Sequence, residues 1–240
     1  AGNADIFVDL VEPGLAAIFA NTIPEISQVN DLISIHCVAT DVAQLALSIN
    51  GEVVATAEAK ELTYDYTIPA EGDYTFTFSA TKGEETKTVS EQTCVVSAPV
   101  HQARPEGVDM GIYYHSPAEG ETLGSVTLST YAASKTAAAK HVFVVGDFNN
   151  WAISNQYQMK QDGNYFWLEI DGLEAQKEYA FQYVVVRADG IIKKISDLYS
   201  EKVLHPDDQY EPKTVNPDLK DYPKGGEGYV SVLQIDKPAF

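Results

Sequence analysis

The 240-residue sequence is poor in basic residues and has no long apolar run. It contains 16 Lys+Arg against 35 Asp+Glu, for a formal net charge of −19. This balance excludes nucleic acid and anionic membranes as partners, because both are bound through basic surfaces. No run of about 20 apolar residues is present, so we expect no membrane insertion. The acidity otherwise favours only solubility, or a neutral or cationic partner.

Cysteine is also scarce, with Cys37 and Cys94 alone in the chain. Neither lies at a metal-ligand spacing from a second ligand. Two states remain open for them: one disulfide, or two buried thiols that pack as small apolar side chains. The five histidines are scattered singly, and only the acids Asp207, Asp208 and Glu211 could together hold Ca²⁺ weakly. We therefore expect no metal site and no cofactor.

The first ten residues, AGNADIFVDL, lack the basic and apolar segments of a secretory signal. The protein is therefore either intracellular or given without its targeting segment. Its β-type composition, rich in Thr, Tyr and Val, favours a secreted and processed protein. We expect a secreted, periplasmic or cell-surface location.

Residues 1–98 carry about seven short strand patterns, with turns every 8–12 residues and no helical period. A weak signal at 6–11 comes first, and clear alternation follows at 32–40 and 74–80. Asn50-Gly51 between two apolar runs predicts a tight hairpin, because both residues accept positive φ. The pattern predicts an immunoglobulin-like β-sandwich.

Residues 99–107 contain two prolines and no periodicity, which predicts a linker. Residues 108–240 then carry a second set of strands. The expected fold is all-β, with two tandem immunoglobulin-like or early-set β-sandwiches.

The stretch 141–151, HVFVVGDFNNW, is the most distinctive of the second domain. Its apolar half predicts a buried strand, and its end predicts an abrupt turn. Asn149 and Asn150 offer amides to sugar hydroxyls, and Trp151 offers an indole face to the C–H side of a pyranose. The alternative is that Trp151 packs on a neighbouring domain. We assign Asp147 to capping of the turn and expect no catalytic residue, because the acids lie in turns and on solvated strand faces.

A second aromatic pair, Tyr165 and Trp167, follows the turn. Strand alternation directs Phe166 toward the core, so we expect Tyr165 and Trp167 to be exposed on the opposite face. Such a pair is either a stacking platform for a sugar or a patch for domain docking. Gln182 and Lys160 are secondary candidates for sugar contact.

Residues 108–235 resemble a carbohydrate-binding module of family 48, an early-set sandwich that precedes the barrel in many glycoside hydrolase family 13 enzymes. The motifs that carry the resemblance are GDFNNW (146–151), YQMK (157–160), DGNYFW (162–167), YAFQYVV (179–185), DG (189–190), YSEKVL (199–204) and GYVSVLQ (228–234). The chain is most similar to the N-terminal region of α-amylase-type enzymes of gut Bacteroidetes, where an immunoglobulin-like domain often comes first.

The resemblance implies starch or glycogen binding through the Trp of the turn, a strand Lys and a second Trp. Trp151 matches the first of these. Gln182 stands where the Lys is expected, and Ile191 and Ile192 stand where the second Trp is expected. These departures favour weak binding or a docking role.

Two functions of different class follow. The first is a non-catalytic N-terminal region of an α-glucan-degrading glycosidase, which weakly binds α-glucan or positions a C-terminal catalytic barrel. The second is a stand-alone surface glycan-binding or adhesion-type protein of two β-sandwiches. The length of the native gene product distinguishes them.

Overall fold

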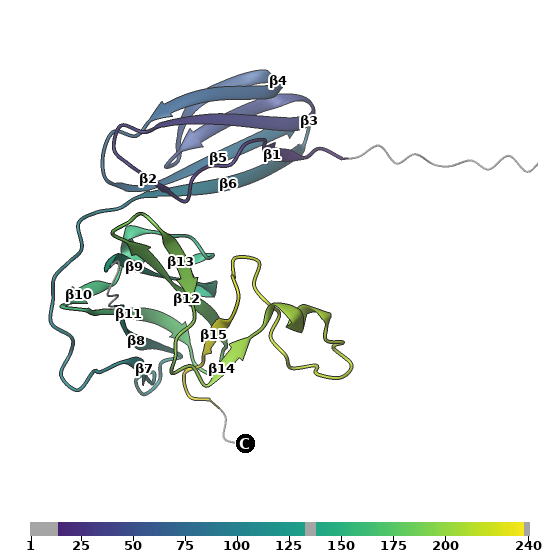
Figure 1. Cartoon of the computed structure of the whole chain (residues 1–240). Helices are drawn as coiled ribbons and strands as arrows, with labels where there is room; N and C mark the ends of the chain where they lie inside the picture. The colour runs from purple at the N-terminus through teal and green to yellow at the C-terminus, as the bar shows by residue number, and fades with distance from the viewer. Residues whose placement is uncertain (1–13, 133–137, 238–240) are drawn as a thin grey trace, which may run out of the picture. The chain divides into compact units, whose positions relative to one another are not determined.

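The computed structural model describes residues 14–132 and 138–237 and divides the chain into two compact units, Ala1–Val95 and Val96–Phe240 (Figure 1). Nearly all regular structure is β, with three short 3₁₀ helices in the second unit. The predicted all-β class is confirmed. The strand expected at 6–11 lies outside the described residues. Among the described residues, no helix has the length and apolarity needed to cross a membrane.

The described part of the first unit contains six strands of one sheet, in the order β1-β3-β5-β6-β2, with β4 paired to β3. Pairing is antiparallel except between β2 and β6. The strands are β1 (Ala17–Phe19), β2 (Ile26–Ser27), β3 (Leu32–Ile49), β4 (Glu52–Thr67), β5 (Gly72–Lys82) and β6 (Glu85–Val95).

Two strands of the first unit, β3 and β4, are longer than the sequence suggests. β3 runs through the expected break near residue 41 and only shifts register between Val38 and Ala43. The prediction that a strand ends at residue 40 is therefore wrong, because a bulge interrupts the alternation without ending the strand. The hairpin at Asn50-Gly51 is confirmed, with φ values of 50° and 84°. Alternate residues of β3 and β5 fill one core.

Cys37 on β3 and Cys94 on β6 are both buried and are not joined by a disulfide. The expected alternative of packed thiols is the one in the structure. Burial raises the pKa of the Cys37 thiol to about 11, so this group stays protonated and apolar.

The second unit is a sandwich of two sheets. One has the order β10-β11-β8-β7, and the other has the order β13-β12-β15-β14 with β9 also paired to β12. The strands are β7 (Gly111–His115), β8 (Leu123–Tyr131), β9 (Ala139–Gly146), β10 (Lys160–Asp162), β11 (Tyr165–Glu174), β12 (Tyr179–Arg187), β13 (Ile192–Ile195), β14 (Lys202–Leu204) and β15 (Val230–Leu233). The 3₁₀ helices are η1 (Asp147–Asn149), η2 (Asn155–Tyr157) and η3 (Pro206–Tyr210).

The core of this sandwich lies between the two sheets. Side chains of β8 and β11, such as Leu128 and Phe166, meet those of β9 and β12, such as Val144 and Phe181. Between β14 and β15 the chain makes a long excursion that includes η3, coloured green to yellow in Figure 1. Its last part returns over the outer face of the second sheet, where Leu219 and Tyr222 pack on a smaller apolar cluster.

The segment expected as a linker, 99–107, begins as part of the second unit. His101 pairs with Gln161 in a parallel bridge, next to β10. The backbone N–H of Gln161 donates to the carbonyl of Val100 at 2.8 Å, and that of Gln102 donates to Gln161 at 3.0 Å. These contacts use backbone atoms, so they leave no periodic pattern in the sequence.

Candidate functional site

The GDFNNW turn follows a strand that is buried on both faces, since Val142–Val145 of β9 have no exposed surface. η1 reverses the chain, and Asn150 and Trp151 take left-handed φ values of 53° and 62°. The side chain of Asn149 accepts from the Gly146 N–H at 2.8 Å and donates to the Val144 carbonyl at 2.9 Å. The amide of Asn149 therefore closes the turn, whereas Asn150 is exposed at its tip.

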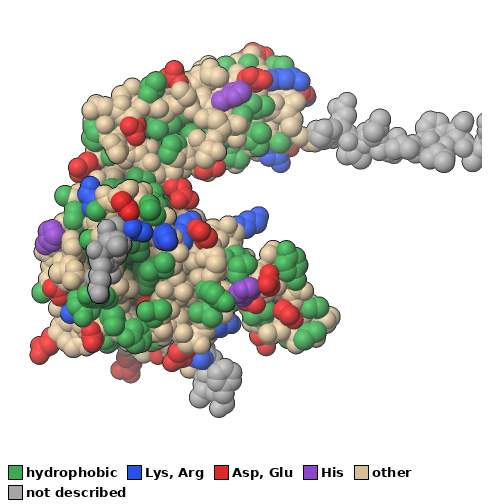
Figure 2. Space-filling view, viewed as in Figure 1, with side chains coloured by type: hydrophobic (Ala, Val, Ile, Leu, Met, Phe, Trp, Pro, Cys, Tyr) green, Lys and Arg blue, Asp and Glu red, His purple; other side chains and the backbone are tan. Residues whose placement is uncertain are grey.

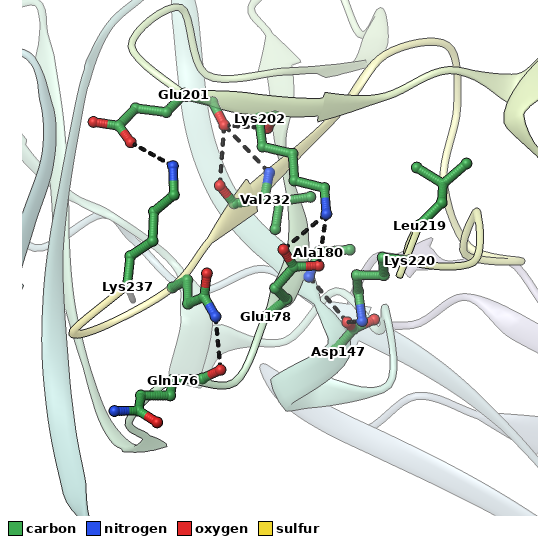
Figure 3. Close-up of polar contacts among 12 residues, drawn as sticks. Asp147, Gln176, Glu178, Ala180, Glu201, Lys202, Leu219, Lys220, Val232 and Lys237 are labelled. Atoms are coloured by element: carbon green, nitrogen blue, oxygen red, sulfur yellow. Dashed lines mark hydrogen bonds and ion pairs between the residues drawn. The ribbon is translucent and has the colours of Figure 1, made fainter. Parts of the chain in front are cut away.

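Asp147 joins this turn to two other parts of the second unit, and the close-up in Figure 3 shows part of this arrangement. Its Oδ1 accepts from Trp151 Nε1 at 3.1 Å, and its Oδ2 accepts from the backbone N–H of Ala180 at 2.9 Å. The ammonium of Lys220 lies 2.9 Å from the same Oδ2. The carboxylate thus braces the turn, but the predicted capping of nearby backbone is wrong, since its backbone partner is Ala180 on β12 and the turn itself is closed by Asn149.

Trp151 packs against its own unit. Its ring belongs to the apolar cluster around Val230 and Leu204, together with Leu219 and Tyr222. The backbone of Gly225 also touches it so closely that a Cβ at this position would lie 2.4 Å from the Trp151 Cβ. Only glycine permits this approach. We call residues 219–229 the cover segment.

Gln182 on β12 anchors the cover segment to the sheet. It is 0% exposed, and its Nε2 donates to the carbonyls of Glu227 at 2.6 Å and Tyr229 at 2.8 Å. Its Oε1 accepts from the Glu227 N–H at 3.0 Å. Lys194 adds a bond from its Nζ to the Gly225 carbonyl at 3.3 Å. Gln182 therefore has both ends of its amide engaged by backbone.

The expectation that Tyr165 and Trp167 are both exposed is wrong for Trp167, which is only 4% exposed. Trp167 Nε1 donates to the Gln102 carbonyl at 3.0 Å, and Lys160 Nζ lies 4.3 Å from the ring centroid. Residues near 102, expected in a linker, cover this face of the sheet. An indole ring gains by such burial when its N–H finds an acceptor.

Tyr165 is partly exposed, and its ring contacts Arg104 and Tyr131. The Arg104 guanidinium is 3.6 Å from its ring centroid, and the Tyr131 ring meets it edge-on at 5.0 Å. Arg104 also donates to Asp162 at 3.1 Å. The hydrogen bonds and charge of Arg104 lower the pKa of the Asp162 carboxyl.

The seven predicted sugar contacts do not form one surface. Four of them lie at the sheet that contains β9 and β12 and at its cover segment: Asn149, Asn150, Trp151 and Gln182. The other three lie on β10 and β11 of the opposite sheet: Lys160, Tyr165 and Trp167. Ile191 and Ile192, where the second Trp is expected, are about half exposed and provide no ring. The role of the seven residues in sugar contact stays a prediction.

The second unit contains two clefts that the sequence does not predict. The smaller, of about 230 Å³, is lined mainly by charged residues and by Tyr114. Its charges pair with one another: Lys202 with Glu178 at 2.7 Å and Lys237 with Glu201 at 3.3 Å (Figure 3). Self-paired charges leave this cleft with little to offer a ligand.

The larger cleft has a volume of about 440 Å³ and combines two tyrosines with polar side chains. Its walls are Thr130, Tyr131, Lys194, Ile195, Ser196, Leu198, Glu227, Gly228 and Tyr229. These residues come from three distant parts of the sequence, so no single local motif indicates the cleft. Figure 2 shows that exposed hydrophobic side chains of this unit lie in patches among polar and charged ones.

No metal centre is evident in the described part of the chain, where no group of three or more His, Cys, Asp or Glu is suitably placed. Asp208, one of the three acids considered for Ca²⁺, accepts from the His205 N–H at 2.7 Å. Asp207 lies beside the same histidine, 3.4 Å from Nδ1. These two acids therefore serve the start of η3.

Comparison with known proteins finds a family model that matches part of the second unit. Residues 111–200 match carbohydrate-binding module 48, the isoamylase N-terminal domain. The match runs from β7 to just before β14 and covers less than half of the chain. It supports a non-catalytic module of the carbohydrate-binding type in this unit. No curated protein matches the chain.

Solved structures show only remote likeness. The fibronectin(III)-like modules of Clostridium thermocellum CbhA align at 12% identity over 74% of this chain and 89% of that chain, with a TM-score of 0.32. Bacteroides uniformis β-glucuronidase 3 aligns at 10% identity over 78% of this chain and 24% of its own, with a TM-score of 0.28. Parabacteroides merdae β-glucuronidase aligns at 10% identity over 76% and 25%, with a TM-score of 0.26. The aligned part is thus about a quarter of each glucuronidase.

Proposed function

We propose that this chain is a non-catalytic region of an α-glucan-degrading glycosidase, and that its second unit binds α-glucan weakly beside a catalytic barrel. The observation that carries the proposal is the match of residues 111–200 to carbohydrate-binding module 48. The α-glucan target and the neighbouring barrel are implied by the resemblance that the GDFNNW stretch and the other ordered motifs carry. A secreted, periplasmic or cell-surface location belongs to the same proposal.

The state of the carboxylates supports a non-catalytic role. A glycosidase needs a general acid whose pKa is raised. The pKa shifts of Asp41, Asp162 and Asp221 are in the opposite direction, because a lysine or arginine bonds each carboxylate. Asp147, beside the aromatic turn, is held by Ala180, Trp151 and Lys220. The lowered pKa values favour the ionised form of Asp41, Asp162 and Asp221, and the contacts of Asp147 stabilise the turn.

Weak rather than tight binding is consistent with the turn. Trp151 and Gln182 occupy two of the three positions at which the resemblance implies sugar contact, and both are engaged by the cover segment. A sugar at this place would have to displace Gly225 and the backbone bonds of Glu227. That exchange opposes binding, because broken internal hydrogen bonds must be replaced.

The test is affinity for α-glucan. The chain should be retarded in native gels that contain amylopectin and not in gels that contain a β-glucan such as laminarin. Isothermal titration with maltoheptaose and β-cyclodextrin should give dissociation constants in the millimolar range or below. Absence of binding to all three α-glucans would overturn the proposed glucan role. A native gene product that lacks a catalytic domain would overturn the glycosidase assignment.

A further inference from the structure

The larger cleft of the second unit has the size of a small-ligand site. Its volume of about 440 Å³ lies within the range of roughly 300–1,000 Å³ that such sites occupy. Tyr131 at the end of β8 forms part of one wall, and Tyr229 just before β15 forms another. The two rings are 47% and 59% exposed. Among the described residues, the cleft therefore offers exposed aromatic surface.

Both tyrosines are held by their surroundings. Tyr131 meets the Tyr165 ring edge-on, and Tyr165 is fixed by Arg104 at 3.6 Å. The Tyr229 ring lies 5.1 Å from His205, and its backbone carbonyl accepts from buried Gln182 at 2.8 Å. Rings fixed in this way lose little conformational entropy when a ligand stacks on them.

The polar groups of the cleft favour a neutral ligand with many hydroxyls. Lys194 and Glu227 bring one charge of each sign, and Thr130 and Ser196 add hydroxyls. A carboxylate accepts from sugar hydroxyls, an ammonium group donates to them, and a hydroxyl does both. Leu198, which is 92% exposed, extends the apolar surface at the rim.

We infer that this cleft, rather than the Trp151 turn, is where the second unit binds a neutral oligosaccharide, with pyranose faces on Tyr131 and Tyr229 and hydroxyls on Lys194 and Glu227. The inference rests on the proposed function for the identity of the sugar as an α-glucan. With a site in the cleft, the module can bind sugar even though the polar groups of the GDFNNW turn are hydrogen-bonded to one another. Gln182 then acts as a positioning residue, since it holds the Tyr229 backbone.

The experiment compares single variants of the full chain. Tyr131→Ala and Tyr229→Ala should each weaken maltoheptaose binding about tenfold in calorimetric titrations, because each removes one stacking face. Tyr131→Phe and Tyr229→Phe keep the face and should stay near the wild-type affinity. Tyr210→Ala is the matched control, because Tyr210 is 75% exposed on η3 and does not line the cleft.

Folding is checked on the same samples by urea unfolding. Both tyrosines are about half exposed, so the midpoints of the alanine variants should stay close to that of Tyr210→Ala. Amide shift changes on titration of the wild type should gather at 194–198 and 227–229. If the wild type binds and both alanine variants retain its affinity, the cleft is not the site and the inference is overturned. If the wild type binds no α-glucan, the proposed function fails instead. Binding of laminarin oligosaccharides that the alanine variants lose would keep the cleft and overturn the α-glucan identity.

Discussion

The second unit contains two aromatic clusters of similar composition and different use. In the GDFNNW turn, Asp147, Asn149 and Trp151 satisfy one another and the neighbouring backbone. In the larger cleft, Tyr131 and Tyr229 are about half exposed, and their walls carry polar side chains. Aromatic and amide residues together therefore do not identify a sugar site. What distinguishes a site is whether ring faces and polar atoms remain available after folding.

The largest effect should come from removal of the brace of the turn. Asp147→Ala leaves the Ala180 N–H and the Trp151 Nε1–H without their acceptor and Lys220 without its partner. We expect the free energy of unfolding of the second unit to fall by about 3 kcal/mol, because unsatisfied buried donors cost about 1–3 kcal/mol each. Urea unfolding followed by tryptophan fluorescence measures it.

The control for this change is Asp171→Ala, since Asp171 is exposed on β11. Its unfolding free energy should stay within about 0.5 kcal/mol of the wild type. The assignment of a structural role to the turn would be contradicted if Asp147→Ala has the unfolding free energy of the control and yet loses glucan affinity. That result would make the turn a binding surface.

A smaller loss of stability, accompanied by weaker glucan binding, should show that the two clusters are linked through Gln182. Gln182→Leu removes three hydrogen bonds to Glu227 and Tyr229 from a fully buried position. We expect a loss of about 2 kcal/mol in unfolding free energy, together with weaker glucan binding, since Tyr229 loses its anchor. Gln209→Leu on exposed η3 is the matched control. A drop in affinity without any loss of stability would mean that Gln182 touches the sugar directly.

Much of the fold could be predicted from local patterns. The alternation in β3 and β5, the Asn50-Gly51 hairpin and the all-β class all follow from side-chain period and turn chemistry. The continuity of β3 could not, because the bulge after Val38 interrupts the pattern without ending the strand. The packing state of Cys37 and Cys94 remained open because sequence spacing does not fix the distance between two strands.

The site was less predictable, for two physical reasons. The cover over Trp167 is made by backbone bonds of residues 100–102, and backbone atoms leave no trace in side-chain pattern. Tyr131 and Tyr229 line one cleft only in the folded sandwich, and Tyr131 lies outside every motif of the resemblance. A structural role for Asp147 was predictable from turn chemistry, but its partners were not, because Ala180 lies on another strand and 33 residues away in the sequence.

A still smaller effect should come from the covered aromatic of the first sheet. Trp167→Phe keeps the ring under the 100–102 segment and removes its Nε1–H bond to Gln102. We expect about 1 kcal/mol of lost stability and faster amide exchange at Gln102 and Gln161, without change in glucan affinity. Lost affinity would show that this face also contributes to binding, and would blur the difference between covered and exposed rings.

The smallest effect is a pH dependence of the strand that leads into the turn. Burial, with a contribution from Lys140, lowers the pKa of His141 below its usual 6.5. The amide Nε2 of Gln158 lies 2.8 Å from His141 Nδ1 and donates to it, so this nitrogen carries no proton in the folded state. The unfolded chain then binds a proton near pH 6.5 more readily than the folded one. The contribution of His141 to stability is complete above that pH and is lost as the pH falls through the lower folded pKa.

Urea unfolding of wild type and His141→Asn between pH 7.5 and pH 5 measures this dependence, because the variant removes the titrating group. The wild type should lose stability as the pH falls, and the variant should lose less. His101→Asn, which changes an exposed histidine, should keep the wild-type slope. Glucan affinity should hold over the range in which the unit stays folded, because His141 does not line the cleft. An affinity that fell with the protonation of His141 while the unit remained folded would show that the β9 turn and the cleft act as one site, and the contrast between the two clusters would not stand.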